Sequence, residues 1–215
     1  EEDPARPLRL RDVAGRFAPA GPPRIIARGP VRTVTESTFV YGASRIVLHT
    51  IAHAAWPVLE FRLRIRWNEE RCCLKLSIPT AFRSADVLCE VPGGLIRRPC
   101  DGQEHIHGRW LLLEGEAAGK PLALGVVNSG QHGLDILDGE ARLSVLRSAA
   151  FCHEKGFPLE AGRAWRFMDQ GIHEVRILVT AGAPEQVRAA LPGLADFLDA
   201  PPTAYSHLPP GIAPP

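Results

Sequence analysis

The sequence predicts a mainly β protein, built as a large antiparallel β-sandwich with one short helix near the C-terminus. Residues 58–67 alternate apolar and charged side chains with a period of two, which is typical of a half-buried strand. Similar short segments recur along the chain, and turn-forming residues separate them. The 215 residues include 20 glycines and 20 prolines, which favours many short elements joined by turns.

The strand predicted at residues 58–67 has two chemically different faces. The apolar face should point into the core, and it carries Leu59, Phe61, Leu63, Ile65 and Trp67. The charged face carries Glu60, Arg62, Arg64 and Arg66. We interpret the charged face as a solvated surface whose arginines pair with acids on a neighbouring strand. A binding strip is the alternative.

The rest of the chain is predicted to form strands as far as residue 179 and then a helix. The strands are expected at residues 31–39, 45–53, 72–78, 86–91, 105–113, 122–128, 141–147 and 173–179. Asp138-Gly139 lies between two apolar runs and predicts a tight hairpin, because this pair suits a type I′ turn. An amphipathic helix is predicted from Pro184, and Pro192 should break it.

These patterns divide the chain into three parts. Residues 1–28 are predicted to be irregular, residues 29–182 to form the sandwich, and residues 183–215 to form the short helix and a proline-rich tail or linker. The sequence begins with Glu1-Glu2-Asp3-Pro4 and has no initiator methionine, so we expect a piece of a longer protein.

Composition argues against several classes of partner. The formal net charge is +1, which argues against a nucleic-acid partner. No apolar run approaches the roughly 18 residues that a membrane helix needs, so we expect no membrane partner. Five cysteines cannot form a complete disulfide framework, and none of them lies in a C-x-x-C pair. Free thiols indicate a reducing compartment, and we expect a cytoplasmic protein.

Residues with catalytic or ligand-binding chemistry are sparse. There is no glycine-rich phosphate loop, G-x-S-x-G elbow or H-E-x-x-H motif. His105 and His107 would share one face of a strand and could meet an ion if His132, His173 or Asp169 supplied a third ligand. Coincidence is the more economical interpretation, and we expect no metal site in this chain.

Two further segments are candidates for ordered polar structure. Asp169, Gly171 and His173 open an apolar strand and predict a structured turn with a hydrogen-bonded core histidine. Arg147 ends an apolar strand. Its guanidinium could form a buried ion pair or point at a ligand oxygen.

The order of motifs along the chain resembles the C-terminal β-domain of glycoside hydrolase family 38, the α-mannosidases. The resemblance covers about residues 29–182, and the segments that carry it are 29–32, 64–70, 74–75, 78–79, 94–99, 125–129, 132–133, 143–148 and 169–174. It implies a galactose-mutarotase-like supersandwich that is non-catalytic and docks on a separate N-terminal catalytic domain.

In such enzymes the catalytic domain holds a zinc ion and an aspartate nucleophile and hydrolyses α-mannosides with retention. The resemblance therefore implies that this chain has no cofactor of its own and is inactive alone. Its partners would be the catalytic domain of the same polypeptide and a mannoside in the full-length enzyme. The resemblance also implies that Arg147 and His132 lie close to the sugar, with His132 near the strand that leads to Arg147.

Two other functions fit the residues less well. A free-standing carbohydrate-binding module would need exposed aromatic platforms, for which Trp56, Trp110 and Trp165 are the candidates. A mutarotase-like sugar epimerase would need a histidine and a glutamate facing one cleft, with His105, His107, His173 and Glu174 as the available residues. His173 and Glu174 are neighbours and should point to opposite faces of a strand.

Overall fold

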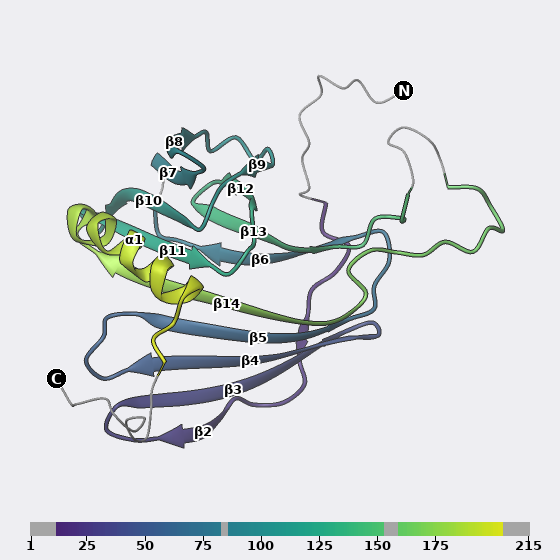
Figure 1. The fold of residues 1–215 in the computed structure, drawn as a ribbon, viewed down its shortest axis with the longest axis horizontal. Helices are drawn as coiled ribbons and strands as arrows, with labels where there is room; N and C mark the ends of the chain where they lie inside the picture. The colour runs from purple at the N-terminus through teal and green to yellow at the C-terminus, as the bar shows by residue number, and fades with distance from the viewer. Residues whose placement is uncertain (1–11, 83–85, 153–158, 204–215) are drawn as a thin grey trace, which may run out of the picture.

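Two antiparallel sheets stacked face to face form the protein (Figure 1). The computed structural model describes residues 12–82, 86–152 and 159–203. The large sheet has ten strands in the order β1-β3-β4-β5-β14-β11-β10-β7-β8, with β2 paired to β3, and the small sheet has the order β6-β13-β12-β9. This confirms the predicted antiparallel, mainly β fold with one helix near the C-terminus.

The strands of the large sheet are β1 (Ala18–Pro19), β2 (Arg24–Arg28), β3 (Arg32–Tyr41), β4 (Ser44–His53), β5 (Leu59–Trp67), β7 (Asp86–Val91), β8 (Gly94–Arg98), β10 (Trp110–Ala117), β11 (Lys120–Asn128) and β14 (Gly171–Gly182). Those of the small sheet are β6 (Cys73–Pro79), β9 (His105–Ile106), β12 (Gly133–Leu137) and β13 (Glu140–Arg147). The helix is α1 (Pro184–Asp199). No helix in the described ranges is long and apolar enough to cross a membrane.

The main core lies between the two sheets. The large sheet contributes Leu63, Ile65, Trp67, Leu111, Val126 and Ile177, and the small sheet contributes Leu134, Ile136, Ala141 and Leu143. These residues alternate with outward-facing ones along each strand, because successive side chains of a strand point to opposite faces. Between β12 and β13, Asp138 and Gly139 both have positive φ, as the predicted hairpin turn requires.

Helix α1 covers the outer face of the large sheet and forms a second core there (Figure 1). Its buried residues pack on side chains of β7, β10, β11 and β14, which include Trp110, Leu112, Val127 and Leu178. Gly125 permits the close approach, since a Cβ there would lie 2.7 Å from Leu191 Cδ2.

The prediction that Pro192 breaks the helix is wrong, because α1 continues through it to Asp199. Pro192 is exposed, so water can satisfy the carbonyl group that its missing N–H leaves unpaired. The residues Leu191 and Leu194 on either side are buried against the sheet. Their burial holds the helix together across the proline.

The N-terminal segment is more ordered than the sequence predicts. Residues 1–28 were expected to be irregular, but β1 and β2 both pair with β3. All five residues of β2 are exposed, so this edge strand lacks the alternating pattern that reveals a strand in a sequence. Backbone pairing and an ion pair of 2.7 Å between Arg24 and Glu36 hold it. Residues 1–11 and the tail residues 204–215 lie outside the described residues.

At the start of β5, the apolar residue is exposed and the charged residue is buried, which is the opposite of what the alternation predicts. Leu59 is 43% exposed, whereas Glu60 is 2% exposed. The Glu60 carboxylate accepts hydrogen bonds from Arg62 Nε at 2.6 Å and Arg176 Nη2 at 2.9 Å. Burial raises the pKa of the Glu60 carboxyl, but the two arginines outweigh it and hold that pKa below its ordinary value. Glu60 pairs across the strands with Arg176 of β14, and Arg64 lies directly opposite Glu174 in the register of β5 and β14.

His107 is a histidine enclosed by the fold. Its side chain is almost fully buried, and neither ring nitrogen has a hydrogen-bond partner among the described residues. Burial, followed by the nearby charge of His132, lowers the pKa of the His107 ring to about 4. The ring is therefore neutral in the folded protein at physiological pH.

Replacing Leu191 with alanine should lower the free energy of unfolding by about 3 kcal/mol, because the change opens a cavity between α1 and the sheet. Chemical denaturation measures the loss. Leu95→Ala is the matched control, since Leu95 is 48% exposed and its truncation should cost far less. Equal losses in the two variants would contradict the packing of α1.

Acid should destabilise the protein partly through His107. Its folded pKa of about 4 lies below the ordinary 6.5, so the unfolded chain binds the proton first as the pH falls. The contribution of the neutral His107 ring to the free energy of unfolding is complete above pH 6.5. It is reduced by about 2 kcal/mol at pH 5 and disappears towards pH 4. Denaturation of His107→Phe at pH 7 and pH 5 should show a correspondingly smaller loss than the unsubstituted chain. If the free energy of unfolding had the same pH dependence in both proteins, this role of His107 would be refuted.

Candidate functional site

Arg147 lies at the end of β13, at the same end of the sandwich as the end of β5 and the start of β6. It pairs with Cys73 of β6. A register shift between Ser144 and Leu146 resets the alternation of β13, so Leu146 is buried and Arg147 is exposed. The strand therefore presents the guanidinium to solvent.

The predicted turn at residues 169–173 lies beside Arg147. Asp169 Oδ2 accepts a hydrogen bond of 2.7 Å from the backbone N–H of Arg147. The turn is shaped by positive φ angles, 55° at Asp169 and 114° at Gly171. His173 is half-buried, and its Nε2 lies 2.8 Å from the carbonyl oxygen of Asp169. The structure thus brings together the turn and the arginine that the sequence singled out separately.

Three further residues tie this end of β13 to the large sheet. Trp67 Nε1 donates a hydrogen bond to Ser148 Oγ. Gln170 Nε2 donates to the carbonyl oxygen of Glu69 at 2.7 Å. We call Trp67, Arg147, Ser148, Asp169 and Gln170 the Arg147 cluster. The roles of Ser148 and Gln170 were missed, because no local pattern shows that their side chains meet residues 81 and 101 positions away.

A network of charged side chains occupies the outer face of the small sheet. Asp135 is fully buried between Lys75 Nζ at 2.8 Å and Arg142 Nε at 3.0 Å. Glu104 contacts both Lys75 and Ser144. Two cations and two carboxylates balance one another, as buried charges require. Lys75 of β6 and Ser144 of β13 belong to this network, and the same two strands pair at Cys73 and Arg147.

Two weak signals for this network can be found in the sequence. Lys75 and Arg142 lie on the polar side of alternating strands, and Gly133 lies where a side chain would collide with the network. A Cβ at Gly133 would be 2.7 Å from Glu104 Oε1 and 2.9 Å from Ser144 Oγ. Burial of Asp135 depends on the crossing segment before β9, whose Gly102 N–H donates to the carbonyl oxygen of Ile136.

The histidines considered as metal ligands do not converge. His105 Nε2 lies 3.2 Å from Asp101 Oδ1, whereas His107 is enclosed in the fold. His132 is exposed, with Nδ1 3.4 Å from the carbonyl oxygen of Gly108. Within residues 12–82, 86–152 and 159–203, no group of three or more His, Cys, Asp or Glu side chains is placed to hold a metal ion. His132 lies near the start of β12 and outside the Arg147 cluster.

The candidate aromatic platforms are occupied by other contacts. Trp110 is 3% exposed beneath α1. Trp56 packs edge-on against His53 and Phe197, with ring centroids 5.2 and 5.1 Å away. Arg163 lies over Trp165, with its guanidinium carbon 4.3 Å from the ring centroid. Such rings are poorly placed to stack on a sugar.

The epimerase interpretation lacks its acid–base pair in β14. His173 is half-buried and bonded to the backbone, while Glu174 is exposed and lies opposite Arg64. The two side chains point to opposite faces of the sheet, as expected for neighbours on a strand.

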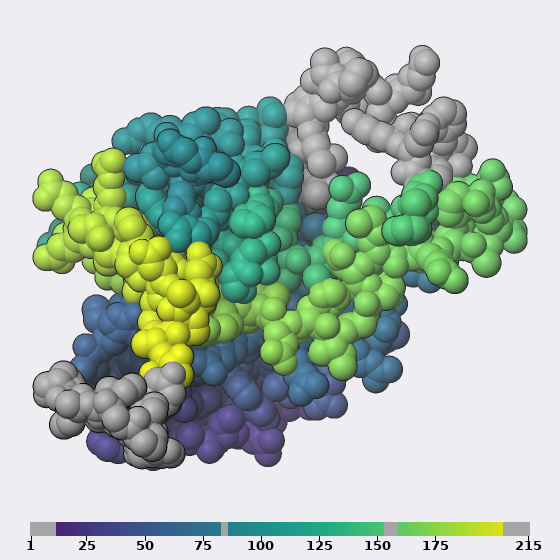
Figure 2. All heavy atoms as spheres, in the orientation of Figure 1, coloured from purple at the N-terminus to yellow at the C-terminus, as the bar shows by residue number. Residues whose placement is uncertain are grey.

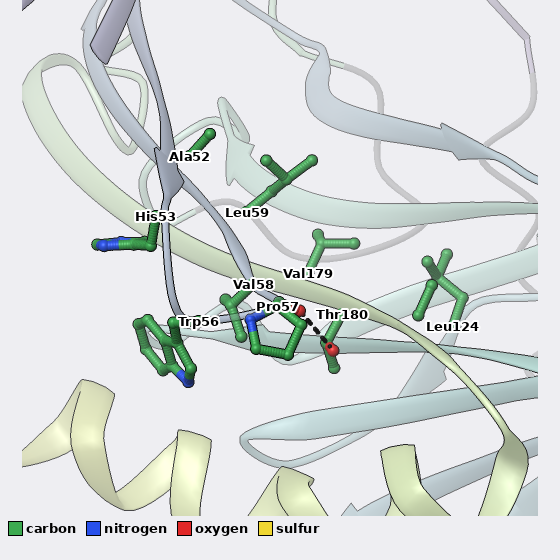
Figure 3. A pocket seen from close by; sticks show the side chains of 10 residues that line it. Ala52, His53, Trp56, Pro57, Val58, Leu59, Leu124, Val179 and Thr180 are labelled. Atoms are coloured by element: carbon green, nitrogen blue, oxygen red, sulfur yellow. Dashed lines mark hydrogen bonds between the residues drawn. The ribbon is translucent and has the colours of Figure 1, made fainter. Parts of the chain in front are cut away.

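An open, mainly apolar pocket of about 400 Å³ lies at the end of the sheet far from Arg147 (Figure 3). The residues that line it are Ala52, His53, Trp56, Pro57, Val58, Leu59, Leu124, Val179, Thr180 and Ala181. The Thr180 hydroxyl donates to the carbonyl oxygen of Pro57 at 2.9 Å. Of the lining residues that the structure describes, His53 alone has an ionisable side chain.

Two solved structures from Enterococcus faecalis share this fold. One is an alpha-mannosidase, which matches with a TM-score of 0.67 and 11% identity over 83% of this chain and 24% of that chain. The other is a protein in glycosyl hydrolase family 38, with a TM-score of 0.66, 11% identity and the same coverage. The chain therefore spans about a quarter of their length. At this identity the likeness concerns the fold alone. No curated protein matches the chain.

A protein-family model identifies the chain more directly. The model of the glycosyl hydrolases family 38 C-terminal domain matches residues 5–153, which is more than half of the chain. The matched region ends shortly after Arg147 and includes the small sheet with its buried charges. The chain belongs to the glycosyl hydrolase family 38 C-terminal domain family.

Proposed function

We propose that this chain is the non-catalytic β-domain of an α-mannosidase-like glycoside hydrolase. In the full-length enzyme a separate N-terminal domain carries out retaining hydrolysis of α-mannosides, and this domain supports it. The observation that carries the proposal is the exposed Arg147, held by the Arg147 cluster in a chain of this family. The partners are the catalytic domain of the same polypeptide and its mannoside substrate.

Zinc belongs to the catalytic domain in this proposal. The donor sets of the described residues do not fit it, because His105 pairs with Asp101 and His107 is enclosed. In that domain, a bound zinc ion would supply the polarisation and orientation of sugar oxygens. The odd number of cysteines and the lack of a C-x-x-C pair support a reducing compartment, and we place the enzyme in the cytoplasm.

Arg147 has a limited chemical role. A guanidinium donates several hydrogen bonds in a fixed plane and does not give up its proton in proteins. It therefore orients an acidic residue or a sugar hydroxyl of the catalytic site and takes no part in proton transfer. Its exposure at the end of the sandwich leaves it accessible to another domain.

In the full-length polypeptide, Arg147→Ala should lower kcat/KM for p-nitrophenyl α-mannoside about tenfold or more, which corresponds to about 1.4 kcal/mol of transition-state stabilisation. The kcat/KM of Arg147→Lys should lie between those of the unsubstituted enzyme and Arg147→Ala, since an ammonium group keeps the charge but lacks the planar, several-donor geometry of the guanidinium. The 215-residue chain alone should be inactive. Arg188→Ala is the control, because Arg188 is exposed on α1 at the other end of β14.

Two results would overturn this function. Hydrolysis by the isolated chain would require a catalytic site within it. An unchanged kcat/KM in Arg147→Ala, with an active full-length enzyme, would remove Arg147 from the sugar site.

A further inference from the structure

The described residues between β13 and β14, 148–152 and 159–170, form two arms that project beyond the ends of the strands (Figures 1 and 2). Backbone hydrogen bonds tie the two arms together, from Phe151 N to Arg166 O at 2.8 Å and from Met168 N to Ala149 O at 2.9 Å. Next to the sandwich, a side chain links the two arms. Asp169 Oδ2 accepts a hydrogen bond from the backbone N–H of Arg147. Asp169 thus closes the base of this projection.

The Asp169 carboxylate is itself held in place. Its residue adopts a left-handed backbone with φ of 55°, a conformation that aspartate and asparagine tolerate better than most side chains. The Asp169 carbonyl lies 2.8 Å from His173 Nε2, and the next side chain, Gln170, bonds to the backbone of Glu69. Contacts on both sides therefore fix the direction in which the carboxylate points.

Asp169 accepts a hydrogen bond from the backbone N–H of Arg147, and this bond does not involve the Arg147 guanidinium. A charged acceptor makes a stronger hydrogen bond to a backbone N–H than a neutral one. The Arg147 guanidinium is exposed and forms no ion pair with any residue that the structure describes. The backbone at the end of β13 is thereby fixed, while the group that can bind a ligand stays available.

We propose that Asp169 is a positioning residue for Arg147, setting where the guanidinium stands by holding the Arg147 amide. This inference rests on the proposed function, in which Arg147 reaches the sugar site of the catalytic domain. Without this hydrogen bond, the end of β13 would keep its backbone contacts with residues 71–73 but lose its link to the turn at Asp169, so the Arg147 backbone could shift. A displacement of about 1 Å is enough to weaken a group that orients substrate.

The test measures kcat and KM of the full-length polypeptide on p-nitrophenyl α-mannoside. Asp169→Ala should lower kcat/KM about tenfold, with the same division between kcat and KM as Arg147→Ala. Asp169→Asn should retain most of the activity, because asparagine keeps an acceptor oxygen and tolerates the positive φ. The double variant should be no worse than Arg147→Ala alone, since both changes remove one function.

Asp138→Ala is the matched control. Asp138 also has a positive φ, 50°, but it lies in the turn at the other end of β13. It shares the backbone strain of Asp169 and should keep kcat/KM. Hydrogen exchange of a peptide covering residues 144–150 gives a readout independent of activity, and it should accelerate in Asp169→Ala only.

Additive losses in the double variant, an inactive Asp169→Asn, or unchanged exchange in Asp169→Ala would overturn the positioning role. If Arg147→Ala is silent, the proposed function fails instead. The exchange measurement then still decides whether Asp169 holds the Arg147 amide.

Discussion

The insertion of β14 between β5 and β11 is the pairing on which the rest of the structure depends. This strand joins the N-terminal strands of the large sheet to the β11-β10-β7-β8 half. Its Ile177 lies in the core against the small sheet, and its Leu178 lies in the core beneath α1. One strand thus belongs to both cores. Because β14 starts at Gly171, the same pairing fixes the turn that holds Arg147.

Two buried carboxylates show how the sandwich accommodates charge. Glu60 in the large sheet and Asp135 in the small sheet are each enclosed by two cationic side chains. Removing one partner from such a group would leave a buried charge unpaired, which costs more than the intact pair contributes. These pairings specify the positions of neighbouring strands. Arg147 differs from these cations because it is exposed at the end of its strand.

The sequence predicted the features that depend on local periodicity. The alternation of β5 correctly placed Ile65 and Trp67 in the core, and Asp138-Gly139 correctly marked a hairpin. The burial of Glu60 and the exposure of Leu59 depend on how far the small sheet and the neighbouring strands extend, which no local pattern contains. Likewise, the continuity of α1 through Pro192 comes from packing against the sheet. At the candidate site, Arg147 and Asp169 were both recognised, but their contact spans 22 residues and required the fold.

The central claim is that the Arg147 end of this domain faces a sugar site in a neighbouring domain. The most direct test is an experimental structure of the full-length protein with a mannose-like inhibitor bound. We expect the Arg147 guanidinium within hydrogen-bonding distance of the inhibitor or of an acidic residue lining its pocket. We also expect Asp169 to remain bonded to the Arg147 amide. An Arg147 side chain that faces bulk solvent, away from the inhibitor, would contradict the account.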